Sequence, residues 1–68
     1  MEIFHIRGEY IELIKLLKAT SLCHTGGMAK MVVTDGLVKV DGEVEFRKRC
    51  KIRRGQIVTF EQTSIKVA

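Results

Sequence analysis

Apolar residues in the first half of the chain recur at the spacing of α-helices. The first stripe has members at i, i+3, i+4 and i+7 and consists of Tyr10, Leu13, Ile14 and Leu17. This spacing predicts a helix over residues 9–19 with the stripe in the core. A second stripe predicts a helix over residues 26–35, and we expect its members in the core: Met28, Ala29, Met31, Val32 and Val33. Thr25 is placed to cap this helix, and Gly36 to end it in a left-handed turn.

From Leu37 onward the apolar spacing shortens to two, which is typical of β-strands. The segments LVKV and VEF are followed, after a turn at Arg54-Gly55-Gln56, by two closing strands, IVTF and SIKV. Residues 2–6, EIFHI, are a candidate opening strand. Helices followed by a run of short strands predict an α+β fold.

Asp41-Gly42, between LVKV and VEF, is a strong hairpin signal. A two-residue loop would place Val40 opposite Glu43. Pairing Val40 with Val44 requires one more residue in the loop, and we expect this wider or bulged turn.

The chain has 68 residues, of which 46% are hydrophobic and 29% charged, so we expect one globular domain over residues 1–68. It contains no apolar run long enough to span a membrane, and residues 1–10 lack the features of a signal peptide. We therefore expect a cytoplasmic protein. Two cysteines, Cys23 and Cys50, are expected to be reduced and buried.

Positive charge is concentrated in one short stretch. The formal net charge is +4, and six of the eight residues in the basic segment (residues 47–54) are cationic: Arg47, Lys48, Arg49, Lys51, Arg53 and Arg54. If the segment is extended, the odd-numbered cations form one row, while Cys50 and Ile52 point inward and anchor it. Such a ridge indicates a polyanion partner. A solvated loop without a partner and a docking site for an acidic protein are the alternatives.

Thr25-Gly26-Gly27 is a second candidate site. The start of a helix offers free N–H groups and partial positive charge to an anion, and glycines allow a close approach. An ordinary cap, with glycines for close packing, explains the same residues.

Other chemistry has little support in the sequence. Cys23-His24 together with Cys50 or His5 lacks the spacing of a metal site. The neighbours of Cys50 would lower the pKa of its thiol, but burial would make it inert. No arrangement of catalytic side chains is discernible. We expect no enzyme activity, no cofactor, no metal and no small-molecule substrate.

A basic ridge on a compact scaffold fits nucleic acid. Proteins that bind single strands add exposed aromatic rings for base stacking, but here Tyr10 is assigned to the core and no aromatic residue lies in an RNP-like motif. Recognition of folded RNA by its shape and backbone is therefore favoured.

Half of the chain also carries a family pattern: a hydroxyl residue with glycines, Ala-Lys, a glycine, Val-x-Val-Asp-Gly, a basic run and Lys-x-x-x-Gly. In this chain these are Thr25-Gly26-Gly27, Ala29-Lys30, Gly36, Val38-Lys39-Val40-Asp41-Gly42, Arg47 to Lys51, and Gly55. The segment from Thr25 to Val58 thus resembles the αL RNA-binding motif of small-subunit ribosomal protein S-four. It is most similar to the short stand-alone bacterial members of that family. Larger members carry Arg or Lys at the position of Gly26, and many have Gly-Asp where this chain has Gly55-Gln56.

The resemblance implies two helices packed on a small, mostly antiparallel sheet. It also implies that structured RNA, either rRNA or tRNA, is bound by the start of the second helix and by the basic segment. A ribosomal or RNA-processing protein is a further candidate partner, and any catalysis would belong to a partner. The expected RNA-binding residues are Thr25, Gly26, Gly27, Lys30, Lys39, Arg47, Lys48, Arg49, Lys51, Arg53 and Arg54.

Overall fold

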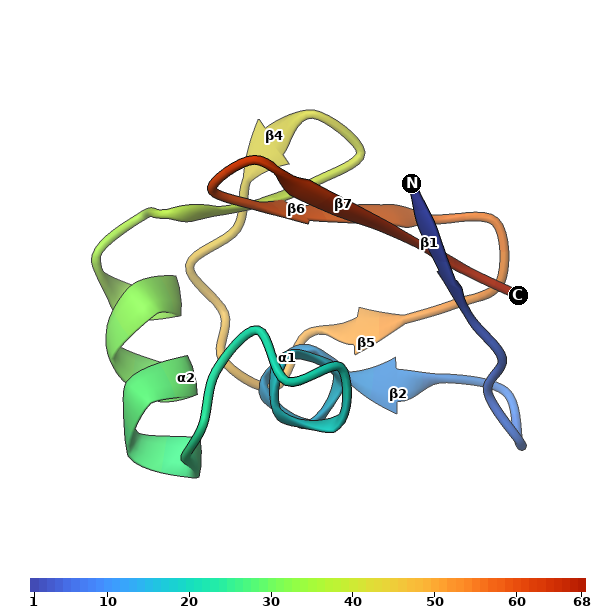
Figure 1. Ribbon diagram of the computed structural model, residues 1–68, viewed down its shortest axis with the longest axis horizontal. Coiled ribbons are helices and arrows are strands. Elements are labelled where there is room, and N and C mark those ends of the chain that lie inside the picture. Colours follow the sequence, from blue (N-terminus) through green and yellow to red (C-terminus); the bar gives the residue numbers. More distant parts are fainter.

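The chain folds into two layers with the core between them (Figure 1). The computed structural model describes all 68 residues. In chain order the elements are β1 (Glu2–Phe4), β2 (Ile11–Glu12), α1 (Leu13–Ala19), α2 (Gly26–Thr34), β3 (Val38–Val40), β4 (Glu43–Val44), β5 (Lys51–Ile52), β6 (Ile57–Phe60) and β7 (Thr63–Val67).

One layer is a five-stranded sheet in the order β1-β7-β6-β3-β4. Strands β1 and β7 are parallel, and the other neighbours are antiparallel. The second layer holds the two helices and a two-stranded ribbon of β2 and β5 (Figure 1). The predicted α+β fold, two helices against a mostly antiparallel sheet, is confirmed. Neither helix has the length and apolar composition needed to cross a membrane.

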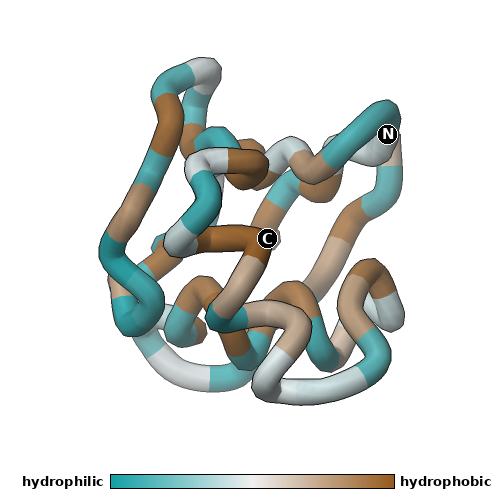
Figure 2. Tube along the Cα trace, turned by 90° about the vertical axis from the view of Figure 1, so that its left-hand side faces the viewer, coloured by the Kyte–Doolittle hydropathy of each residue, from teal (hydrophilic) through white to brown (hydrophobic).

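The core contains apolar side chains alone, and no polar or charged residue is buried. Both layers supply residues that are fully buried: Leu13, Leu16 and Leu17 of α1, Ala29 and Val33 of α2, Ile52 of β5, and Val38, Val58 and Val67 of the sheet. The hydropathy along the trace changes over short intervals, as expected for elements with one buried side (Figure 2). Cys23 is buried in this core, as predicted.

Helix α2 forms close to where the apolar stripe predicts it. The Thr25 hydroxyl accepts a hydrogen bond from the Met28 N–H at 3.0 Å, which confirms the cap, and Gly36 has a left-handed φ of 75°. Met31 is an exception to the predicted core, because 58% of it is exposed. The buried side of a short helix against one neighbour is narrow, and Ala29, Val32 and Val33 occupy it.

The first helix differs from the prediction at its start. Helix α1 begins at Leu13 rather than at residue 9, because Ile11 and Glu12 are extended and pair with Ile52 and Lys51. Tyr10 therefore lies outside the helix, and 41% of it is exposed, so its assignment to the core is wrong. Pairing with a strand distant in sequence overrides the local helical period here.

The hairpin at Asp41-Gly42 has the tight two-residue loop, so the expected wider turn is wrong. Val40 pairs with Glu43, and Asp41 and Gly42 have φ of 51° and 85°. Two successive positive φ angles are what a type I′ turn requires, and Asp-Gly suits them. Strand β4 is at the sheet edge with both residues exposed. Because no buried side chain demands another register, the turn residues determine it.

Candidate nucleic-acid interface

The basic segment does not form one extended ridge. It turns at Lys48 and Arg49, where the Cys50 N–H donates to the Arg47 carbonyl at 3.1 Å, and only Lys51 and Ile52 are in a strand. A second turn follows, with the Gln56 N–H donating to the Arg53 carbonyl at 3.2 Å. The predicted single row of odd-numbered cations is therefore wrong.

The start of α1 accounts for the first of these turns. No side chain caps this helix, and its first N–H groups would otherwise lack acceptors. The Leu13 N–H donates to the Cys50 carbonyl at 2.9 Å, and the Ile14 N–H donates to the Lys48 carbonyl at 3.2 Å. The backbone of the basic segment thus caps α1 and bends to do so.

Ile52 anchors the segment as predicted, whereas Cys50, which was expected to be buried, is so only in part. Ile52 is fully buried opposite Ile11, and Cys50 is half-buried against the core. Arg54 adds a tether, because its guanidinium donates to the Gly8 carbonyl at 2.8 Å and to the Ile6 carbonyl at 3.0 Å. The cations are therefore presented on a fixed backbone.

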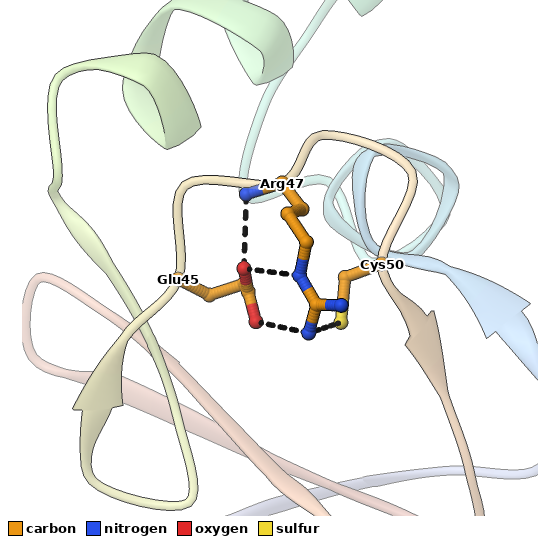
Figure 3. A network of polar contacts seen from close by, with 3 residues as sticks. All are labelled: Glu45, Arg47 and Cys50. Carbon is orange, nitrogen blue, oxygen red and sulfur yellow. Dashed lines mark hydrogen bonds and ion pairs between the residues drawn. The ribbon is translucent and has the colours of Figure 1, made fainter.

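Arg47 is held by Glu45 rather than projecting freely (Figure 3). Its Nε and Nη2 atoms each lie 3.0 Å from a Glu45 carboxylate oxygen, and its backbone N–H donates to Oε2 at 2.9 Å. The hydrogen bonds from Arg47 lower the pKa of Glu45 to about 2. In return, the Glu45 carboxylate raises the pKa of Arg47.

Cys50 completes this network, since Nη2 of Arg47 lies 3.7 Å from its Sγ (Figure 3). Burial raises the pKa of the Cys50 thiol, and the nearby Glu45 carboxylate adds to this effect. Of the two influences weighed from the sequence, burial and flanking cations, burial thus has the larger effect on the pKa of this thiol. Burial likewise raises the pKa of Cys23. No three His, Cys, Asp or Glu side chains are grouped in a way that could hold a metal ion.

Arg49 is also paired within the protein. Its Nε atom lies 3.0 Å from the Glu12 carboxylate, which Lys15 approaches to 3.7 Å. The hydrogen bond from Arg49 is the main cause of the lowered pKa of Glu12. Three of the six cations of the basic segment therefore already have partners within the protein. These are Arg47, Arg49 and Arg54. The other three make no side-chain hydrogen bond or ion pair: Lys48, Lys51 and Arg53.

The fold joins Lys30 to the basic segment. A groove between the helices and the segment is lined by Glu12, Ile14, Lys15, Lys30, Lys48 and Arg49. A neighbouring hollow shares Arg49 with this groove and is lined by Arg47, Arg49, Cys50 and Lys51. Lys30 follows Gly26 by four residues, which places it on the same helix face as the start of α2. The surface formed by the groove and the hollow thus carries six cations, together with one carboxylate, that of Glu12.

Lys39 is not part of this surface. It lies between Val38, which is buried, and Val40, which is half-buried, so its side chain points to the outer face of the five-stranded sheet. The basic segment belongs to the opposite layer (Figure 1). Lys39 therefore lies on another face of the molecule from the groove and the hollow.

Sequence reasoning missed Tyr10 as a surface residue beside these cations. The Nζ atom of Lys51 lies 4.9 Å from the centre of its ring, and the Cζ atom of Arg53 lies 5.7 Å from it. The signal that would have revealed this is Ile11, an apolar residue that the helical stripe leaves unexplained. Side chains that alternate between the two sides of the backbone at Tyr10, Ile11 and Glu12 would place Ile11 inward and Tyr10 outward, which is the period of a strand.

Comparisons with known proteins, by family model, by sequence and by structure, all identify the same family. A family model described as the S4 domain matches residues 4–68. Over 58 residues the chain is 48% identical to "Putative RNA-binding protein YbcJ" of Escherichia coli (strain K12), covering 85% of this chain and 83% of that protein. It has the same identity and coverage to "Uncharacterized protein YbcJ" of Shigella flexneri. The solution structure of YbcJ from E. coli, described as revealing an αL motif involved in RNA binding, superposes with a TM-score of 0.77. That match has 43% identity and covers 100% of this chain and 87% of the other.

Proposed function

Because the chain belongs to the S4 domain family, we propose that it is a non-catalytic RNA-binding domain that recognises structured RNA through phosphate contacts. The relative from E. coli is named as an RNA-binding protein, and its solved structure is described by a motif involved in RNA binding. The domain spans residues 1–68 and acts in the cytoplasm, with rRNA or tRNA as the class of RNA. A ribosomal or RNA-processing protein is a candidate partner in the same complex.

The observation that carries the proposal is a set of four exposed cations that have no carboxylate partner. Lys30 and Lys48 line the groove, Lys51 lines the neighbouring hollow, and Arg53 lies beside Lys51 over the same ring. Cations without internal partners can displace the counterions condensed on RNA phosphates, and this release dominates affinity for nucleic acid. Arg47 and Arg49 line the surface as ion pairs with Glu45 and Glu12, and Arg54 donates to two backbone carbonyls; we propose that these three contribute less than the free cations.

The start of α2 extends this surface. The Thr25 hydroxyl uses the Met28 N–H, and the N–H groups of Gly26 and Gly27 have no acceptor in the protein. A Cβ added at Gly26 would meet nothing within 4 Å, and one at Gly27 would meet only the Thr25 hydroxyl at 3.8 Å. Close packing therefore does not require these glycines. Two free amides at the positive end of a helix dipole suit a phosphate, so we include Thr25, Gly26 and Gly27 in the proposed interface.

The test is equilibrium binding of an end-labelled RNA hairpin, followed by fluorescence anisotropy. We expect Lys30→Ala and Lys48→Ala each to weaken binding several-fold without changing the melting temperature, because both side chains are exposed. Lys66→Ala is the matched control, because Lys66 is an exposed lysine between the buried Ile65 and Val67 of β7. The Lys66→Ala protein should bind RNA with the affinity of the unmodified protein. Lys39→Ala should also bind close to normally, because the fold places it on the outer face of the sheet.

An acidic polypeptide with the same net charge as the RNA hairpin is added as a competitor. Under the proposal it displaces RNA weakly, because extended carboxylates do not match the spacing of phosphates on folded RNA. Tighter binding of the polypeptide than of RNA would favour the alternative, a module that docks an acidic protein. An equal loss of affinity in Lys66→Ala would also contradict the proposed surface.

A further inference from the structure

Tyr10 has the position of a functional surface residue rather than a core residue. In the β2–β5 ribbon Ile11 pairs with Ile52, and both side chains contact the core. Tyr10 and Glu12 flank Ile11, so the alternation of the strand turns them to the opposite side, away from the core. Lys51 and Arg53 flank Ile52 in the same way. The outer side of the ribbon therefore displays one aromatic ring with two cations next to it, together with the Glu12 carboxylate.

The ring is open to a ligand. Tyr10 is 41% exposed, its hydroxyl makes no hydrogen bond in the protein, and both neighbouring cations are exposed and free of carboxylates. Contacts between cations and an aromatic ring are weak where water reaches them, so Lys51 and Arg53 are free to move to phosphates. Exposed aromatic rings beside cationic side chains are the arrangement on which proteins stack the bases of unpaired nucleotides.

We propose that Tyr10 stacks against one unpaired base of the bound RNA, while Lys51 and Arg53 contact the phosphates on either side of that nucleotide. The proposal rests on the proposed RNA-binding function and adds to it a requirement for an unpaired nucleotide next to the helical part of the RNA. A domain limited to phosphate contacts would bind a continuous duplex equally well. The stacking site makes a bulged or looped structure the preferred ligand.

The experiment compares two RNA hairpins that differ in one base. Both carry a single bulged nucleotide in the stem; in one it is adenosine, and in the other it is an abasic ribose that keeps the phosphate. We expect the protein to bind the adenosine hairpin roughly 5- to 150-fold more tightly, the range typical for stacking of one base on an aromatic side chain. Tyr10→Phe should keep this preference, because it keeps the ring. Tyr10→Leu should lose it and bind both hairpins as the unmodified protein binds the abasic one.

A second measurement uses the unmodified protein and so does not depend on a variant folding. The chain has one tyrosine and no tryptophan, so its near-ultraviolet emission comes from Tyr10. Stacking should shorten the fluorescence lifetime of Tyr10 with the adenosine hairpin but not with the abasic one.

Equal affinity of the unmodified protein for both hairpins would overturn the stacking site and leave RNA binding itself intact. The same conclusion would follow if Tyr10→Leu kept the preference. Failure of the unmodified protein to bind either hairpin would overturn the RNA-binding function together with the stacking site. These results are distinguishable in one set of titrations.

Discussion

The dependence of RNA binding on salt tests how the cations are used. The basic segment and Lys30 together hold seven cations, but Arg47, Arg49 and Arg54 already have partners within the protein. If only Lys30, Lys48, Lys51 and Arg53 displace counterions from phosphates, the logarithm of affinity should fall against the logarithm of salt concentration with a slope of about −3.6. Between about 50 and about 200 mM salt, affinity then falls roughly 150-fold. If all seven cations took part, the slope would be about −6.3 and the loss roughly 6,000-fold.

The assay is a series of anisotropy titrations of one RNA hairpin at several salt concentrations, with single variants alongside. Lys48→Ala should make the slope shallower by about 0.9, because one phosphate contact is lost. Glu12→Gln should make it steeper by a similar amount, since it frees Arg49 from its carboxylate partner. Lys66→Ala, the control on the outer face of the sheet, should leave the slope unchanged.

Two outcomes would refute this reasoning. A slope near −6 would mean that the internal ion pairs open when RNA binds, so that the geometry of the free protein does not determine which cations act. A response that is flat in salt would exclude phosphate contact as the main source of affinity.

Three further predictions concern the scaffold and the helix start. Ile52→Ala should destabilise the fold by about 2–5 kcal/mol and Ile52→Val by about 0.5–1.5 kcal/mol in urea unfolding, because Ile52 is fully buried; equal effects would contradict its role as an anchor. Glu45 has a folded pKa of about 2, below its ordinary value, so its ion pair with Arg47 contributes fully above about pH 5 and is lost as the pH falls toward about 2. Unfolding of Glu45→Gln should lack this part of the acid dependence, and an identical acid profile would rule the contribution out. Gly26→Asp should leave the melting temperature unchanged or slightly raised, since the added side chain has space and suits the helix dipole, yet weaken RNA binding at least several-fold; unchanged affinity would remove the helix start from the interface.

The sequence by itself determined the features that depend on residues close together in the chain, such as helix caps and turns. Thr25 caps α2, Gly36 ends it, and Gly55 allows the turn before β6, each within a few residues of the partner concerned. The burial of Ile52 within a run of cations also follows from sequence, because alternation in a strand separates apolar from charged side chains over two residues.

The tertiary structure decided the features that depend on partners distant in the chain. Tyr10 lies at the surface because Ile11 pairs with Ile52, and Arg49 is neutralised by Glu12, 37 residues away in sequence. The basic segment bends because the uncapped start of α1 takes its carbonyls as acceptors. The spacing of apolar residues indicates which side of a segment is buried. It does not indicate which distant group will accept a hydrogen bond from a free amide or form an ion pair with a charged side chain. For that reason the cluster of cations could be predicted from the sequence, whereas the division between paired cations, free cations and an exposed ring arises only in the folded chain.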